Sequence, residues 1–476
     1  MVVGQCGNQI GEAFWKLALH EHGIQTLRNA NPQLPPRHSH SKLFDAFHSF
    51  FYIPENNVSK LRTLADLETC KIKARAVCID MEDSVVARFQ TGSLRHLFDE
   101  TCLITNYPGS DKRAEGYYTH GGRYKDRIVE AVRKAAEKCD NLHGFLMLFS
   151  LGGGTGSGLG CATLGFLEDS FPRVDRGSEP AFAWRERGKP FRKNHPQFTR
   201  PRFGTSISPS SAVELNTTSA LANYATETGY SYSLIDLVEL FVTCVYPAGN
   251  EDVVTAPYNV TLATRELSRH ATCVFPVHNK ALMDICDRLR SGVESTETAK
   301  FVATCKPFQD MNSIVVNMLL HLTRQGDLLN GALSRNNQLL KVDPMSGTLM
   351  SSAIIGRGAL SMTDMRTNVA KLYERGRFVP WGRDAIKVGL CSVPPAVHPS
   401  ALLCLLNSSN MSTLFQDVAG KFNRLYRRGA HLHHYLGVNE FEKDNFTESI
   451  NSLMETATKY SSVENVKPIF RPRVSV

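Results

Sequence analysis

A run of glycines constrains this chain more than any other segment. Residues 150–158 read Ser-Leu-Gly-Gly-Gly-Thr-Gly-Ser-Gly, between an apolar, strand-like segment at 142–151 and a helical pattern at 159–171. Clustered glycines let a backbone approach phosphate oxygens closely, and the free N–H groups and dipole at a helix start attract anions. A flexible turn is the simpler alternative. The strand before and the helix after favour a phosphate-binding loop, to which the hydroxyls of Ser150 and Thr155 can contribute.

The spacing of these glycines excludes the two commonest nucleotide-binding loops. No Lys-Ser/Thr pair follows them, as a Walker loop requires. The positions at which a Rossmann fingerprint needs its third glycine hold Ser157, Leu159 or Cys161. The predicted phosphate loop therefore belongs to another class.

Apolar strand-like segments alternate with amphipathic helical ones along much of the chain. Strands are predicted at residues 73–81, 142–151, 241–246, 273–277, 349–355 and 387–393. Helices are predicted at residues 126–138, 159–171, 311–322, 412–436 and 446–460. Nearly continuous apolar strands followed by helices are typical of a parallel sheet, so the pattern predicts an α/β fold.

Length and composition exclude several classes of protein. The 476 residues suffice for about three domains, and 42% of them are hydrophobic, so a disordered or fibrous protein is excluded. No apolar run approaches the roughly 20 residues of a membrane helix, and the first residues lack the features of a signal peptide. No membrane partner is therefore predicted. Twelve cysteines without a Cys-x-x-Cys pair indicate free thiols in a reducing cytoplasm.

The alternation of strands and helices stops between about residues 177 and 240. Seven basic residues and one acid lie between positions 185 and 202, with four prolines in and around this stretch. Such a composition predicts a poorly ordered segment. A nucleic-acid-binding arm is the alternative interpretation, but few aromatic residues accompany the charges. No nucleic-acid partner is therefore predicted, despite the formal net charge of +8.

Two further pairs of residues are candidates for ligand binding. Asp80 and Glu82 lie at the end of a predicted strand, where ligands of parallel sheets bind, and two carboxylates there suit Mg²⁺ opposite phosphates. Phe308 and Asn312 share one helix face, where a ring can stack on a base and an amide can read its edge. Taken alone, Asp80 and Glu82 are equally well explained as surface carboxylates exposed to solvent. Phe308 and Asn312, taken alone, are better explained by ordinary packing and capping than by base binding.

Seven motifs together resemble the tubulin superfamily in order and spacing. They are Gly4-Gln-Cys-Gly-Asn-Gln-Ile10, Ala76-Val-Cys-Ile-Asp-Met-Glu82, Gly152-Gly-Gly-Thr-Gly-Ser-Gly158, Ala256-Pro-Tyr-Asn259, His278-Asn-Lys-Ala-Leu282, Phe308-Gln-Asp-Met-Asn312 and Phe422-Asn-Arg-Leu-Tyr-Arg-Arg428. Two others are most similar to the epsilon branch of that family, namely Cys391-Ser-Val-Pro-Pro395 and Ala430-His-Leu-His-His-Tyr435. The missing glutamate-rich carboxyl-terminal tail also resembles that branch.

The resemblance implies a site for GTP and Mg²⁺. Asp80 and Glu82 are expected to face the metal ion. The residues expected to line the nucleotide are Gln5, Cys6 and Gln9 after the first strand, Ser150, Gly152, Gly153, Gly154, Thr155 and Gly156 in the phosphate loop, and Asn279, Phe308 and Asn312 at the guanine. No residue of this chain is expected to be catalytic.

The resemblance also implies an order of domains. A tubulin-like nucleotide-binding domain with a parallel sheet is expected in two parts, 1–176 and 241–305, separated by an insertion at 177–240. A core helix at 306–324, a truncated α+β middle domain at 325–405 and a carboxyl-terminal helical region at 406–476 are expected to follow.

The chain departs from the family pattern at four places. The family has several residues before Val2, and Ser110-Asp-Lys-Arg-Ala114 replaces an asparagine-containing loop near the terminal phosphate. Residues 177–240 are inserted, and a block of helices and strands is missing after Thr323. In tubulins that block carries the acidic residue that positions the attacking water on a neighbouring subunit, so its loss predicts that this chain does not complete hydrolysis there. An imperfect gene model is favoured over a divergent isoform.

The favoured function is a GTP-binding, epsilon-type cytoskeletal protein with a structural or assembly role in centrioles, basal bodies and microtubule organisation. Its expected partners are other tubulins associated with the centriolar triplet. Its expected location is the cytoskeleton of the cytoplasm, at a centriole, centrosome or basal body. Two alternatives stay open. One is a self-contained GTPase of the fold shared with bacterial division proteins, disfavoured by Arg427, Arg428 and the carboxyl-terminal helices. The other is a non-functional product of a faulty gene model.

Overall fold

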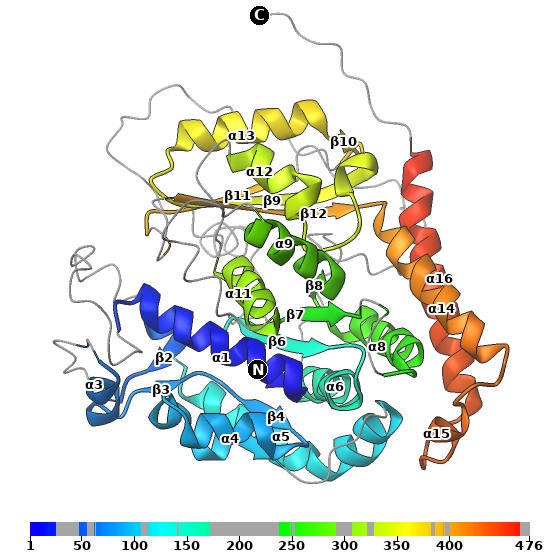
Figure 1. Cartoon of the computed structure of the whole chain (residues 1–476), viewed down its shortest axis with the longest axis horizontal. Coiled ribbons are helices and arrows are strands. Elements are labelled where there is room, and N and C mark those ends of the chain that lie inside the picture. Colours follow the sequence, from blue (N-terminus) through cyan, green and yellow to red (C-terminus); the bar gives the residue numbers. More distant parts are fainter. Residues whose placement is uncertain are drawn as a thin grey trace, which may run out of the picture. The chain divides into compact units, whose positions relative to one another are not determined.

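Figure 1 shows the computed structural model of the chain. It describes residues 1–24, 47–54, 61, 63–105, 113–139, 142–171, 238–247, 249, 253–291, 307–320, 328–381, 386–393, 395 and 400–466. Within these ranges, no helix is long and apolar enough to cross a membrane. The segment 177–240, predicted to be poorly ordered, lies outside the described residues except for its last three.

A six-stranded parallel sheet confirms the predicted α/β fold. The order of its strands is β5-β4-β1-β6-β7-β8, and every neighbouring pair is parallel. The strands are β1 (Val2–Val3), β4 (Cys78–Asp80), β5 (Leu103–Thr105), β6 (Gly144–Ser150), β7 (Glu239–Tyr246) and β8 (Cys273–His278). β7 begins before the predicted residue 241, because the buried Leu240 belongs to the sheet.

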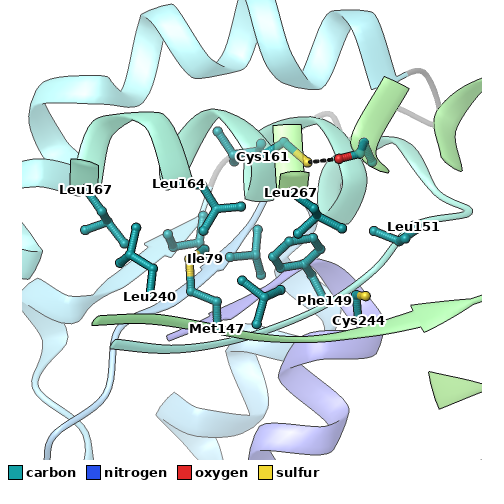
Figure 2. Close-up of a cluster of buried hydrophobic side chains, with 14 of the residues drawn as sticks. Ile79, Met147, Phe149, Leu151, Cys161, Leu164, Leu167, Leu240, Cys244 and Leu267 are labelled. Atoms are coloured by element: carbon teal, nitrogen blue, oxygen red, sulfur yellow. Dashed lines mark hydrogen bonds between the residues drawn. The ribbon is translucent and has the colours of Figure 1, made fainter. Parts of the chain in front are cut away.

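Helices cover both faces of this sheet (Figure 1). One face carries α5 (Gly121–Glu137), α6 (Gly160–Ser170) and α8 (Ala256–His270). Figure 2 shows the core on this face, where Met147 and Phe149 of β6 lie among Leu164, Leu240 and Leu267. The opposite face carries α1 (Gly4–Glu21) and α11 (Pro307–Leu319). Leu148 packs there because successive residues of a strand point to opposite faces.

Two predicted elements are each divided in the structure. The strand predicted at 73–81 is β3 (Lys73–Ala74) followed by β4, because β3 pairs with β2 (Phe51–Tyr52) in a separate antiparallel sheet. The helix predicted at 412–436 is α14 (Met411–Tyr426) followed by α15 (His433–Leu436). The chain turns between them at Gly429 and His431, which have φ angles of 62° and 59°.

A second sheet forms around β9 (Thr348–Gly358). β10 (Arg377–Phe378) and β11 (Ile386–Cys391) pair with β9 in parallel, and β12 (Ser400–Ser408) pairs with it antiparallel. Two helices, α12 (Leu328–Leu333) and α13 (Met362–Arg375), share an apolar cluster with this sheet that includes Ile354, Met365 and Leu402.

The carboxyl-terminal helices pack on the first sheet's outer layer. α14 and α16 (Lys443–Ser462) contact each other and α8. Leu414, Phe415 and Leu453 join the core that α8 shares with the sheet. α8 itself was missed as a helix, because its buried face includes polar and β-branched residues such as Asn259 and Thr261, which blur the apolar stripe.

A nearly buried ion pair joins helix α1, which packs on the first sheet, to strand β9 of the second sheet. Glu21 lies at the end of α1 and Arg357 lies in β9, with the carboxylate 3.3 Å from the guanidinium and about a tenth of each side chain exposed. The Arg357 guanidinium also donates to the backbone oxygen of Leu320, just after α11, and to that of Val393. One side chain therefore holds the ends of α1 and α11 to the second sheet.

The change Glu21→Gln is expected to lower the free energy of unfolding by about 2–3 kcal/mol, because it leaves the buried Arg357 without its carboxylate. Urea unfolding followed by circular dichroism measures the loss. The matched control is Glu455→Gln, which breaks the exposed pair with Lys459 and is expected to cost about 0.5 kcal/mol or less. Equal costs for the two variants would contradict the proposed importance of the buried pair.

Candidate functional site

The glycine-rich segment lies at the carboxyl end of β6, in the middle of the parallel sheet. Ser150 is the last residue of the strand, and the following helical segment begins at Gly154. Its first turns, Thr155–Leu159, have π-helical geometry and continue directly into α6. The N-terminal N–H groups of this long helix therefore lie at the sheet edge where parallel α/β folds bind ligands, as the phosphate-loop prediction requires.

The glycines of the segment serve two different purposes. A Cβ atom on Gly156 would lie 2.8 Å from the backbone oxygen of Ser150, and one on Gly158 would lie 2.4 Å from that of Arg113. Both positions exclude side chains because of close packing. Among the residues that the structure describes, none would lie within 4 Å of a Cβ atom on Gly153. Within these residues, the backbone at Gly153 leaves room for a ligand to approach.

The turn between β1 and α1 packs against the same segment. Gly4 has a φ of +72°, and a Cβ atom there would lie 3.0 Å from the backbone nitrogen of Gly156. The predicted residues that follow are Gln5, which is exposed, and Cys6 and Gln9, which are half-buried. Burial raises the pKa of the Cys6 thiol to about 12, so this side chain stays neutral and is suited to lining a site rather than to nucleophilic attack.

Asn8 fastens this turn to the neighbouring strand and was not singled out from the sequence. Its Nδ2 atom donates to the backbone oxygens of Gly4 and Ile79, both at 2.9 Å. The side chain is fully buried. The sequence does place an asparagine one turn into a helix that begins at a glycine turn. An amide exposed to solvent fits the same position, so the sequence alone does not predict the buried role of Asn8.

The two predicted metal-site carboxylates occupy different environments. Asp80 ends β4 and is 1% exposed, whereas Glu82 is exposed and precedes α4 (Asp83–Thr91). The Glu82 N–H donates to Asp80 Oδ1 at 3.4 Å, but the buried Asp80 Oδ2 has no hydrogen-bond partner among the residues that the structure describes. Burial raises the pKa of Asp80 to about 7. A buried carboxylate oxygen that lacks a partner suits a cation or an ordered water.

Asp80 and Glu82 are the described residues that would hold the predicted Mg²⁺ ion. Among the residues that the structure describes, no three His, Cys, Asp or Glu side chains come together as a metal site. Mg²⁺ takes few protein carboxylates and fills its other positions with water and phosphate oxygens. Asp80 and Glu82 therefore fit an ion that a phosphate group completes.

The three residues predicted to contact a base lie on α9 (Asn279–Ser291) and α11, two helices that contact each other. Asn279 is half-buried and begins α9, directly after β8. Phe308 is 66% exposed near the start of α11, and Asn312 is half-buried one turn later. α11 contacts both α1 and α9, and α1 also contacts the π-helical start of the phosphate loop helix. The base candidates therefore connect to the phosphate loop through α11 and α1.

A hydrogen bond from α8 reaches the phosphate loop and was also missed. Asn259 Nδ2 donates to the backbone oxygen of Gly152 at 2.7 Å. The sequence pointed to Asn259 only as part of a motif that resembles the family, and it did not predict this hydrogen bond.

The altered segment 110–114 is described only at its end. Arg113 is buried and donates to the Leu262 backbone oxygen at 3.2 Å, while residues 110–112 lie outside the described part of the chain.

Comparisons with known proteins identify the family of this chain. Residues 1–175 match the family model of the tubulin/FtsZ GTPase domain, and residues 307–419 match that of the tubulin C-terminal domain. The chain is 32% identical to the tubulin epsilon chain of Homo sapiens over 98% of its length and 95% of that protein. It is also 32% identical to the tubulin epsilon chain of Mus musculus, over 99% of this chain and 97% of that protein.

Tubulin chains of another type are also similar to this chain. The tubulin alpha chain of Pneumocystis carinii is 26% identical over 97% of this chain and 95% of that protein. The alignment with the human epsilon chain spans 529 positions, more than the 476 residues of this chain. The human protein therefore has residues at positions where this chain has none.

The two kinds of glycine predict two different outcomes of substitution. Gly156→Ala is expected to lower the free energy of unfolding by about 2 kcal/mol, because its methyl group collides with the Ser150 backbone. Gly153→Ala is expected to change it by less than about 1 kcal/mol, because nothing lies near the added methyl group. Urea unfolding without nucleotide measures both. Equal destabilisation would show that the two glycines do not differ in packing.

Proposed function

Because this chain belongs to the tubulin family, we propose that it is a GTP-binding tubulin of the epsilon type, with a structural and assembly role at centrioles and basal bodies. One observation carries the nucleotide part of the proposal. A helix N-terminus lies at the carboxyl edge of the parallel sheet, where no described residue crowds the backbone at Gly153 and the turn at Gly4 packs alongside. Phosphate groups bind at such helix starts through backbone N–H groups.

Each predicted site residue has a role in this proposal. Ser150, Gly152, Gly153, Gly154, Thr155 and Gly156 hold the phosphates. Gln5, Cys6 and Gln9 line the nucleotide from the start of α1. The amides of Asn279 and Asn312 read the guanine edge, and the exposed ring of Phe308 stacks on the base. Mg²⁺, when bound near Asp80 and Glu82, would neutralise charge on the phosphate oxygens.

The epsilon assignment rests on the pattern of similarity. The two epsilon relatives are more identical to this chain than the alpha and beta chains compared with it. We propose that its partners are other tubulins and that it resides in the cytoskeleton. We also propose that this chain lacks the residue that completes GTP hydrolysis on a neighbouring subunit, because the block after Thr323 is missing. The chain would then bind GTP itself without promoting hydrolysis of the GTP bound to its neighbour. A tubulin C-terminal domain favours this reading over a solitary bacterial-type GTPase.

The change Asn312→Ala tests the guanine assignment. It is expected to weaken GTP binding about tenfold, because the guanine edge loses a polar partner inside its site. The affinity of the purified full chain for GTP, measured by isothermal titration calorimetry, checks this. The control is Ser313→Ala, an exposed neighbour on the same helix. If Asn312→Ala binds GTP as tightly as the unaltered chain does, the guanine assignment is wrong.

The proposed location is tested separately. The full chain carrying a fluorescent tag is expected to concentrate at centrioles or basal bodies and to be absent from the walls of cytoplasmic microtubules. Fluorescence microscopy with a centriolar marker measures both. Uniform labelling of cytoplasmic microtubules would contradict the epsilon-type role, while leaving GTP binding unaffected.

A further inference from the structure

A buried chain of hydrogen bonds runs from the carboxyl-terminal helices to the phosphate loop. The Tyr435 hydroxyl, in α15, donates to Asn259 Oδ1 at 2.6 Å. Asn259 Nδ2, in α8, donates in turn to the backbone oxygen of Gly152 at 2.7 Å. Neither Tyr435 nor Asn259 is accessible to solvent. Two side chains therefore link a region remote in sequence to the first glycine of the loop.

The direction of these bonds fixes the orientation of the Asn259 amide. The Gly152 carbonyl can only accept, so the amide nitrogen faces it and the amide oxygen faces the Tyr435 hydroxyl. That hydroxyl also lies 3.4 Å from the backbone oxygen of Thr255, a longer contact. Burial raises the pKa of Tyr435, so its hydroxyl stays protonated and remains a donor. If the hydroxyl is removed, the amide oxygen loses its strongest partner in a site that water does not reach. The amide is then free to reorient.

The bond to Gly152 also orients the next peptide N–H. In a trans peptide the carbonyl of one residue and the N–H of the next point in opposite directions. Because Asn259 holds the Gly152 oxygen on its own side, the N–H of Gly153 is directed away from α8. At Gly153, no described residue lies within 4 Å of an added Cβ atom. The hydrogen bond from Asn259 thus fixes the direction of the Gly153 N–H, one of the donors available to a phosphate.

Tyr435 is itself held firmly. Its ring lies 5.5 Å from that of Tyr258, 5.2 Å from that of Phe446 and 5.7 Å from that of Phe441, measured between centroids. Such an aromatic cluster leaves the hydroxyl little freedom. Tyr258 makes a second hydroxyl contact across the same interface, to the backbone oxygen of Ala430 at 2.8 Å, but this contact does not reach the loop.

We propose that Tyr435 is a positioning residue for the phosphate loop, acting through Asn259, and that it makes phosphate affinity depend on the placement of the carboxyl-terminal helices. The inference rests on the proposed function, because it presumes that the loop binds the phosphates of a guanine nucleotide. A change that moves α15 relative to α8 alters the Gly153 donor and with it the affinity for phosphate.

The test compares Tyr435→Phe with Tyr258→Phe in the full chain. Each variant removes one buried hydroxyl from the same aromatic cluster, but only the first breaks the connection to Gly152. Affinities for GTP, GDP and guanosine are measured by competition against a fluorescent guanine nucleotide, together with the urea unfolding midpoint. Tyr435→Phe is expected to weaken GTP and GDP about fivefold and to leave guanosine unchanged, because one neutral hydrogen bond behind the phosphates is lost. Tyr258→Phe is expected to leave all three affinities unchanged.

Two results would overturn the inference. One is nucleotide binding by Tyr435→Phe equal to that of the unaltered chain. The other is a parallel loss for guanosine, or an equal loss in Tyr258→Phe, which would indicate general loosening of the interface. Failure of the unaltered chain to bind any guanine nucleotide is a distinct outcome, which would overturn the proposed function itself.

Discussion

The arrangement of this protein depends on the close approach of two backbones, at Gly4 and Gly156. A side chain at Gly4 would lie 3.0 Å from the Gly156 nitrogen, so only glycine permits the contact. It brings the starts of two helices together at the carboxyl ends of the adjacent strands β1 and β6. Each helix start carries free N–H groups and partial positive charge, so this edge attracts an anion. The surrounding contacts fix the position of the two helix starts relative to each other.

Buried polar contacts, rather than apolar ones, provide that register. Asn8 holds the first turn to β4, Asn259 holds the loop to α8, and Glu21 holds the far end of α1 to Arg357. Apolar packing keeps helices against the sheet, but it has no direction and does not fix a peptide plane. A hydrogen bond does fix direction, and losing one in a buried site leaves a polar group without a partner. Polar side chains therefore occur where orientation matters most.

The sequence predicted what depends on local pattern and missed what depends on tertiary contacts. The strand, the glycines and the helix from residue 142 to 171 are contiguous, so their pattern alone indicated the loop. The strand predicted at 73–81 is divided because β3 pairs outside the main sheet, a choice that no local apolar run reveals. α8 was missed because it is buried on most sides. Asn259 and Tyr435 are 176 residues apart, so only the fold shows that they meet.

The buried Asp80 links the stability of the fold to whatever the site binds. Within the described part of the chain its Oδ2 atom has no hydrogen-bond partner, although the side chain is 1% exposed. Burying such a group costs free energy. Folding by itself does not recover that cost. A cation or a donor that arrives with a ligand recovers it, and any ligand that binds only the folded state adds its own free energy of binding to stability. The cost at Asp80 therefore falls at the sheet edge proposed to bind the ligand, where a cation bound together with phosphate would recover it.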